Sequence, residues 1–279
     1  MRQAGARRQK AAILPRWFRG CDVASDGPMP IELYYWPTIQ GRGEFVRLLL
    51  EDAGADYVDV ARSKGGMAKM MRFLDGDEPG ALPFAPPFVR VDGTVVSQTA
   101  NVLDFLAPRL GLAPADEEER AEVAQVQLTL ADLLGEVHDT HHPIAGSLYY
   151  EDQRREAKRR AQSFVKERLP KYLGSLEAAL ARNASGWLVG RECTYADLSA
   201  FQMVEGLRYA FPNAMARLES KLGRLIALRD RVAKRPRLAA YLASPRRIPF
   251  NQEGIFRRYP ALDAPAARRK RRRGPKRPR

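Results

Sequence analysis

Ser97, Gln98 and Thr99 form a short polar run directly before residues 101–106, which we expect to begin a helix. The first N–H groups of a helix have no partners within it and carry partial positive charge, so a helix start of this kind can bind an anion such as a carboxylate. The pattern therefore indicates an anion site at Thr99. An ordinary hairpin followed by an ordinary helix is the alternative reading of the same residues.

The segment before this run predicts two paired strands, 88–91 and 94–96. Both are rich in residues that favour strands, and the Asp92-Gly93 dipeptide between them is typical of two-residue hairpin turns. The pair should therefore be antiparallel. Pro86 and Pro87 precede the first strand. Cis peptide bonds occur almost always before proline, so either residue is a candidate cis-proline.

Histidines 138, 141 and 142 are the other group with possible chemistry. His138 and His142 lie four residues apart on one helical face, a spacing that can hold a metal ion. A third ligand does not accompany them in the sequence, and Pro143 ends the helix there. We interpret them as a polar helix end near a cleft between domains and expect no metal.

The elements that must position Thr99 begin upstream. Residues 31–36 read as a strand, 44–53 as an amphipathic helix ending at Gly54, and 57–60 as a second strand, which together make a βαβ unit with parallel strands. Residues 62–83 predict an irregular helix within loops. With the hairpin and helix that follow, the first part of the chain predicts an α/β layer with a mixed sheet.

After a linker at 108–114 the chain reads as helix throughout. Apolar residues recur at three- and four-residue steps over 117–142 and 151–181, and Pro170 should kink or divide the second of these helices. Thr194-Tyr195-Ala196-Asp197 has the form of a capping box that starts a helix over 195–208. Further helices are expected at 215–234 and 238–243, followed by an irregular segment over 246–263.

Net charge and cysteine content limit the functional classes. The formal charge of +14 comes from the two ends, because residues 1–29 hold six basic and two acidic residues and residues 264–279 hold nine basic residues and no acid. Subtracting these from 47 basic and 33 acidic residues leaves 32 and 31 for residues 30–263, so the charge implies no basic binding face on the fold. We interpret both ends as disordered extensions. For residues 264–279 we favour a solvated tail over contact with nucleic acid.

Two cysteines, Cys21 and Cys193, cannot form a disulfide framework, and the sequence has no apolar run long enough to cross a membrane. We therefore expect a soluble protein of the cytoplasm. Residues 1–29 are rich in arginine, as transit peptides are, but poor in serine. A natural start at Met29 explains them equally well.

The order of these elements resembles the cytosolic glutathione transferases, most closely the tyrosine-type members, with a bacterial-like pattern. The resemblance is carried by the strand end Leu33-Tyr34-Tyr35-Trp36, the run Arg47-Leu48-Leu49-Leu50-Glu51, the Pro87-Phe88-Val89 strand entry, the pair Gln98-Thr99, and Gly190 with Thr194-x-x-Asp197. It implies a thioredoxin-like α/β domain over 30–107 that binds glutathione, followed by an all-helical domain over 115–245.

The resemblance also implies a reaction and the residues that perform it. Such enzymes join the thiol of reduced glutathione to a hydrophobic electrophile, with glutathione as co-substrate and no permanently bound cofactor. The tyrosine at the end of the first strand stabilises the thiolate, and the match places this role on Tyr35, whereas Tyr34 points to the opposite face. The other residues implied at the glutathione site are Trp36, Gln40, Pro86, Pro87, Gln98 and Thr99.

Two departures from the family pattern bear on this site. The loop after Tyr35 is about one residue longer, with Gln40 where an arginine is common. The residue before the family's cis-proline normally binds the cysteinyl part of glutathione through its N–H and C=O; if Pro87 is that proline, Pro86 has no N–H to offer, and if Pro86 is, Ala85 supplies both groups.

The family is usually dimeric, and we expect a homodimer in which Asp132 of one subunit meets the glutathione amine in the other. Candidates for the electrophile pocket are Tyr209, Phe211, Phe250, Ile255 and Phe256, although most should be core. A non-catalytic module that binds a protein partner remains the alternative function, since a fold does not fix a function. A nucleic-acid-associated protein acting through its tails is a third.

Overall fold

The computed structural model describes residues 30–265, so the two basic ends, and the predictions made for them, lie outside the described residues. A four-stranded sheet has the order β2-β1-β3-β4, with β1 at Ile31–Tyr34, β2 at Tyr57–Asp59, β3 at Phe88–Val91 and β4 at Thr94–Ser97. β1 pairs parallel with β2 and antiparallel with β3, which in turn pairs antiparallel with β4. The predicted mixed sheet is confirmed.

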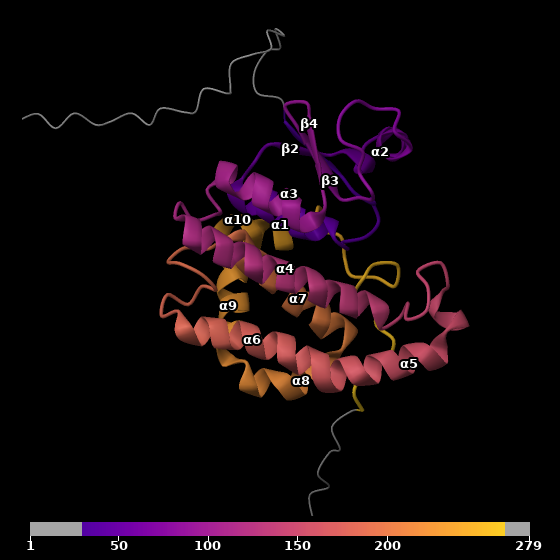
Figure 1. The fold of residues 1–279 in the computed structure, drawn as a ribbon, viewed down its shortest axis with the longest axis vertical. Coiled ribbons are helices and arrows are strands. Elements are labelled where there is room, and N and C mark those ends of the chain that lie inside the picture. Colours follow the sequence, from indigo (N-terminus) through magenta and orange to yellow (C-terminus); the bar gives the residue numbers. More distant parts are fainter. Residues whose placement is uncertain (1–29, 266–279) are drawn as a thin grey trace, which may run out of the picture.

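Helices cover both faces of this sheet (Figure 1). α1 (Gly43–Ala53) and α3 (Thr99–Leu106) lie between the sheet and the helical domain, whereas α2 (Gly66–Asp75) lies on the other side. Tyr34 stacks on Phe88 and packs edge-on against Phe73 of α2, with ring centroids 4.5 and 5.1 Å away. Strand alternation therefore places Tyr34 in the core, as predicted, and turns Tyr35 away from α2.

Particular residues determine where the hairpin turns and where the strands and helices of the sheet domain end. Asp92 and Gly93 both have positive φ, +47° and +82°, as a type I′ turn requires. β1 stops at Tyr34, two residues before the expected end, and Pro37 follows soon after. The helix predicted within loops over 62–83 is α2, and glycines in the left-handed conformation bound it at positions 65 and 76.

The second part of the chain is all helical. α4 (Glu117–Asp139) is followed by α5 (Arg154–Ser163), α6 (Leu169–Arg182), α7 (Tyr195–Ala210), α8 (Pro212–Leu218), α9 (Gly223–Ala233) and α10 (Pro236–Leu242). The single helix expected over 215–234 is wrong. It is two helices, since a 3-10 turn at Glu219–Lys221 separates α8 from α9.

Pro170 divides the helix expected over 151–181. It is the second residue of α6 and follows a π-helical turn at Phe164–Arg168. A proline ring collides with the carbonyl four residues earlier, and the wider π turn makes room for it.

Thr194 and Asp197 form the predicted capping box at the start of α7. The Thr194 N–H donates to the Asp197 carboxylate at 2.8 Å, and the Asp197 carboxylate also accepts from the Leu188 N–H at 2.9 Å. One buried side chain therefore fixes both the helix start and the turn before it. Burial raises the pKa of Asp197 to about 6, against the lowering effect of these hydrogen bonds.

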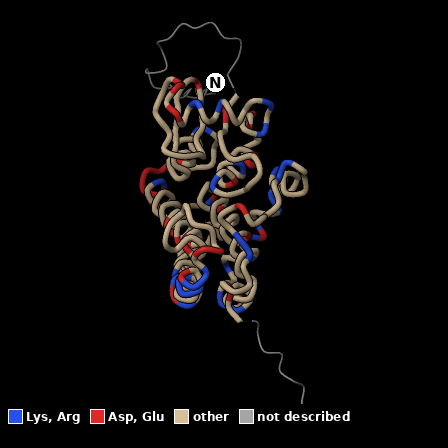
Figure 2. Tube along the Cα trace, turned by 90° about the vertical axis from the view of Figure 1, so that its right-hand side faces the viewer, with Lys and Arg blue, Asp and Glu red and all other residues tan. Residues whose placement is uncertain are grey.

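Residues 246–263 have no regular secondary structure, as predicted. They begin beside the loop after β1, where the Asn251 amide donates to the Thr38 carbonyl, and run along the helical domain to α8, where Asp263 accepts from the Asn213 N–H (Figure 1). Acidic and basic residues are interspersed along the described chain (Figure 2). Among residues 30–265, no helix combines the length and the apolar character needed to span a membrane.

Candidate functional site

Thr99 begins α3, as the anion-site prediction requires. The first helical bond is that from the Val102 N–H to the Gln98 carbonyl at 2.8 Å, so the N–H groups of residues 99–101 have no partner within the helix. The hydroxyl of Thr99 is buried and has no hydrogen-bond partner in the described chain. The helix start therefore offers unpaired groups to a ligand.

Gln98 holds a strained conformation at this position. Its φ of +70° and ψ of +119° are unusual for a residue with a side chain. Strain of this kind costs about 1–3 kcal/mol and occurs preferentially at ligand sites. The side chain itself is exposed, beside the helix start.

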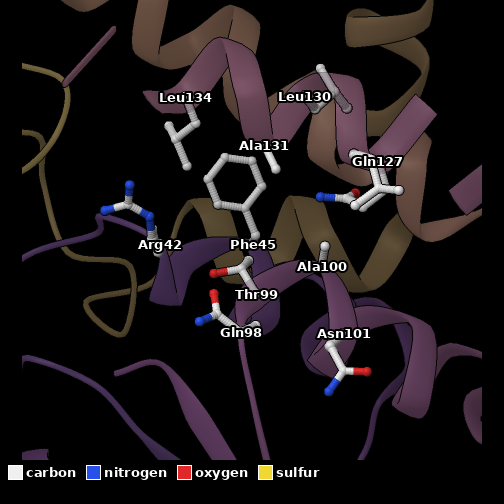
Figure 3. A pocket seen from close by; sticks show the side chains of 11 residues that line it. Arg42, Phe45, Gln98, Thr99, Ala100, Asn101, Gln127, Leu130, Ala131 and Leu134 are labelled. Carbon is white, nitrogen blue, oxygen red and sulfur yellow. The ribbon is translucent and has the colours of Figure 1, made fainter. Parts of the chain in front are cut away.

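A cavity of about 380 Å³ opens at the α3 start (Figure 3). Gln98 and Thr99 line it from below, Arg42 and Phe45 from the loop and helix after β1, and α4 closes the opposite side. Arg42 is the single charged residue among those that line it, which makes this cavity suited to an anionic group.

Tyr35 directly follows β1, with only 3% of its surface exposed. Its hydroxyl oxygen accepts a hydrogen bond from the Arg42 N–H at 2.8 Å, and glycines at 41 and 43 allow the backbone to pass close to the ring. Burial raises the pKa of Tyr35, against the lowering effects of that N–H and the charges of Arg42 and Arg47. The phenol is therefore protonated at neutral pH, and its proton has no acceptor among the described residues.

Arg42 connects the two parts of the site. Its backbone N–H binds the hydroxyl of Tyr35, while its side chain lines the cavity that contains Gln98 and Thr99. Tyr35 is not itself among the residues that line this cavity. The structure thus brings Gln98 and Thr99 together at the cavity and connects Tyr35 to it through Arg42.

Gln40 faces elsewhere. It is buried, its side-chain oxygen accepts from the Gln202 amide at 2.7 Å, and its own amide donates to the Ile248 carbonyl. Both polar ends of Gln40 are thus engaged between the two domains, and the prediction that it contacts glutathione finds no support in this geometry. Trp36 is half-buried and packs with the cluster around Tyr34, on the α2 side.

The proline pair is resolved by the backbone. The bond between Pro86 and Pro87 is cis, so Pro87 is the cis residue and precedes β3. Pro86, which comes before it, can offer a carbonyl oxygen to a ligand but no N–H.

The aromatic candidates for an electrophile pocket are mostly core. Phe211, Ile255 and Phe256 are buried, while Tyr209 and Phe250 are half-buried and stack with ring centroids 5.0 Å apart. Only the Tyr209–Phe250 pair retains a partly exposed surface.

The three histidines come together as stacked and tilted rings with centroids 4.8–5.5 Å apart. In the described part of the chain, no group of three or more His, Cys, Asp or Glu residues is arranged to hold a metal ion. Burial lowers the pKa of His141 to about 2, and Nε2 of this residue is buried without a partner among residues 30–265.

Sequence reasoning missed Gln127, which lies on α4 and lines the same cavity. A signal was present, since Gln127 falls on the apolar stripe of Val123, Leu130 and Leu134, all buried. A polar residue on the buried stripe of an amphipathic helix calls for a partner, and the neighbouring sequence offers none.

Comparison with known proteins agrees with this architecture. Residues 138–245 match the family model described as the glutathione S-transferase C-terminal domain. Glutathione S-transferase P 10 of Caenorhabditis elegans is 28% identical over 212 residues, which cover 76% of this chain and 90% of the relative. Glutathione S-transferase P of Bos taurus is 29% identical over 234 residues, covering 81% of this chain and 98% of the relative.

A solved glutathione S-transferase structure from Caenorhabditis elegans superimposes with a TM-score of 0.58 at 26% identity. It covers 77% of this chain and 98% of its own length. The chain is similar to cytosolic glutathione S-transferases over most of its length, and its helical domain matches their C-terminal family model.

Proposed function

We propose that this protein is a glutathione transferase that joins the thiol of reduced glutathione to a hydrophobic electrophile. The observation that carries the proposal is the pairing of a hydroxyl proton on Tyr35, free to donate, with an anion-binding cavity at Thr99, both connected through Arg42. In this proposal the γ-glutamyl carboxylate of glutathione binds the α3 start, and the sulfur lies at the hydroxyl of Tyr35.

The mechanism follows from acid–base chemistry. A free thiol has a pKa near 8.5, so little of it is thiolate at neutral pH. The Tyr35 hydroxyl donates its free proton as a hydrogen bond to the sulfur, which favours the charged form, and the thiol proton leaves to solvent. The thiolate then attacks the electrophilic carbon, forming the S–C bond as the leaving group departs with its electron pair.

The burial of Tyr35 makes this hydrogen bond stronger. The N–H of Arg42 already donates to the phenol oxygen, which polarises the O–H towards an acceptor, and a buried hydrogen bond is less screened by water. Pro86 would hold the cysteinyl part of glutathione through its carbonyl alone. This proposal therefore places most of the recognition at the γ-glutamyl end.

We further propose that the protein works in the cytoplasm as a homodimer and detoxifies electrophiles. The buried, unpaired Cys193 is consistent with a reducing compartment. Leu128 of α4 exposes 58% of its surface beside the cavity, where a second subunit would cover it.

A second candidate function is a non-catalytic module that binds a protein partner. The absence of an N–H at Pro86 favours it, because half of a typical backbone contact to glutathione is lost.

The test is glutathione binding by calorimetry together with turnover of a chlorodinitrobenzene. Wild type should bind and turn over, and Thr99→Ala should weaken binding about five- to tenfold through loss of one hydrogen bond. Thr94→Ala, on the exposed end of β4, is the matched control and should leave binding unchanged. Binding without turnover would support the module, and no binding by wild type would refute the proposed transferase.

A further inference from the structure

Gln127 is a buried polar side chain whose oxygen has nothing to bind. It lies on the core-facing stripe of α4 with 3% of its surface exposed, and its Oε1 has no hydrogen-bond partner among the described residues. A buried acceptor left unpaired costs about 1–3 kcal/mol. Such a residue in an otherwise apolar stripe indicates a ligand that supplies the missing donor.

The side chain points into the cavity at the α3 start. Figure 3 shows the Gln127 amide directed from α4 towards the space beside Phe45, with Thr99 and Gln98 across from it. Rotation about the last side-chain torsion presents either the oxygen or the nitrogen to that space. Among the polar residues that line the cavity, Gln127 is the only one that is buried as a whole residue.

The cavity therefore has two unlike sides. The α3 start, the Thr99 hydroxyl and Arg42 suit a carboxylate, whereas the Gln127 oxygen suits a donor. No Asp or Glu lines the cavity, so a donor on the α4 side would be bound by the neutral Gln127 oxygen and not by a carboxylate of the lining residues. A group that carries a carboxylate and an ammonium on one carbon, the α-amino-acid group, matches both sides.

We propose that Gln127 accepts a hydrogen bond from the α-ammonium of the γ-glutamyl residue of glutathione, so that one subunit recognises both charged groups of that end. This inference rests on the proposed function and names a specificity residue for it. The alternative is that a carboxylate of a second subunit binds the ammonium, and the exposed Asp132 on the same helix is the candidate for that carboxylate.

The experiment compares glutathione with its glutaryl analogue, which keeps the carboxylate and lacks the α-amine. Calorimetry gives the Kd of the S-methyl form of each ligand, and turnover of the thiol forms gives KM and kcat. Wild type should bind glutathione at least about tenfold more tightly than the analogue. Gln127→Leu should lose that discrimination, weakening glutathione binding about ten- to a hundredfold and binding of the analogue less than about twofold.

Folding does not confound this variant. Gln127→Leu removes an unpaired buried acceptor and completes an apolar stripe, so the Tm of the ligand-free protein should stay the same or rise. Gln125→Leu, at an exposed position on the same helix, is the matched control and should retain discrimination.

Three results would overturn the inference while leaving the proposed function intact. Gln127→Leu could weaken both ligands equally, which would assign Gln127 to the carboxylate or to packing. It could leave both unchanged. Asp132→Asn could abolish discrimination in place of Gln127→Leu, which would assign the amine to a partner subunit. A wild type that binds neither ligand overturns the proposed function itself, and this inference with it.

Discussion

The side-chain amide of Gln202 on α7 donates a 2.7 Å hydrogen bond to the side-chain oxygen of Gln40, in the loop after β1. The same Gln202 accepts from Arg247, and Arg247 donates to the fully buried carboxylate of Glu44 on α1. A continuous polar chain therefore joins the sheet domain, the helical domain and the C-terminal segment. The Gln40 loop leads directly into Arg42, which binds the hydroxyl of Tyr35.

Replacing Gln202 with leucine should destabilise the protein by about 1–3 kcal/mol, because Gln40 and Arg247 each lose a buried partner. Urea unfolding measures the change. Gln125→Leu replaces an exposed glutamine in a helix and should stay within about 0.5 kcal/mol of wild type. Equal stability of the two variants would show that the chain of hydrogen bonds contributes nothing to folding.

Tyr35→Phe should lower kcat/KM with a chlorodinitrobenzene about ten- to a hundredfold at neutral pH, since a hydrogen bond to the charged sulfur is lost. The pKa of bound glutathione should rise by about one to two units, and the pH profile of kcat/KM should shift upward with it. Burial raises the pKa of Tyr35, so the phenol remains a donor throughout this range.

Tyr34→Phe is the matched control for that variant. Tyr34 lies on the α2 side of the sheet and donates to Glu32 at 2.9 Å, away from the cavity at Thr99. It should leave the pH profile in place. An unshifted profile in Tyr35→Phe would refute the role assigned to Tyr35.

Gly206→Ala should destabilise the protein by about 1–3 kcal/mol. A Cβ at Gly206 of α7 would lie 2.4 Å from ring carbons of Phe256, so the C-terminal segment packs here only because the helix lacks a side chain. A Cβ at Gly135 of α4 would meet nothing within 4 Å, and Gly135→Ala should stabilise by about 0.5–1 kcal/mol through helix propensity. Thermal unfolding of both variants tests the sign difference; a stabilised Gly206→Ala would contradict the packing argument.

Stability should fall as the pH drops below about 6.5, in part through His141. Burial lowers the pKa of His141 to about 2, and the charges of Arg257, His142 and His138 lower it further in the same direction. Between about pH 2 and the ordinary histidine pKa of about 6.5, the unfolded chain therefore binds a proton that the folded chain does not. The contribution is about 1.4 kcal/mol for each pH unit below about 6.5. His141→Gln should therefore show a flatter fall between about pH 6 and pH 5 in urea unfolding. Parallel curves for the two proteins would contradict the assignment.

Local patterns were sufficient for much of the fold. The turn at Asp92-Gly93, the capping box at Thr194 and the interruption at Pro170 are short-range effects of residue chemistry, and each was predicted in place. The helix expected over 215–234 failed for the opposite reason. Its apolar spacing continues across Glu219–Lys221, so the periodicity gives no sign of the 3-10 turn there.

The sequence by itself determined the order of strands and helices in the sheet domain, the helix start that follows Gln98 and the near-neutral charge of residues 30–263, because these follow from neighbouring residues and composition. Only the tertiary structure decided that Gln40 binds Gln202 and that Gln127 faces the cavity. Gln40 and Gln202 are 162 residues apart, and they meet only because the two domains pack together. The direction in which Gln127 points depends on the same packing, which no local pattern encodes.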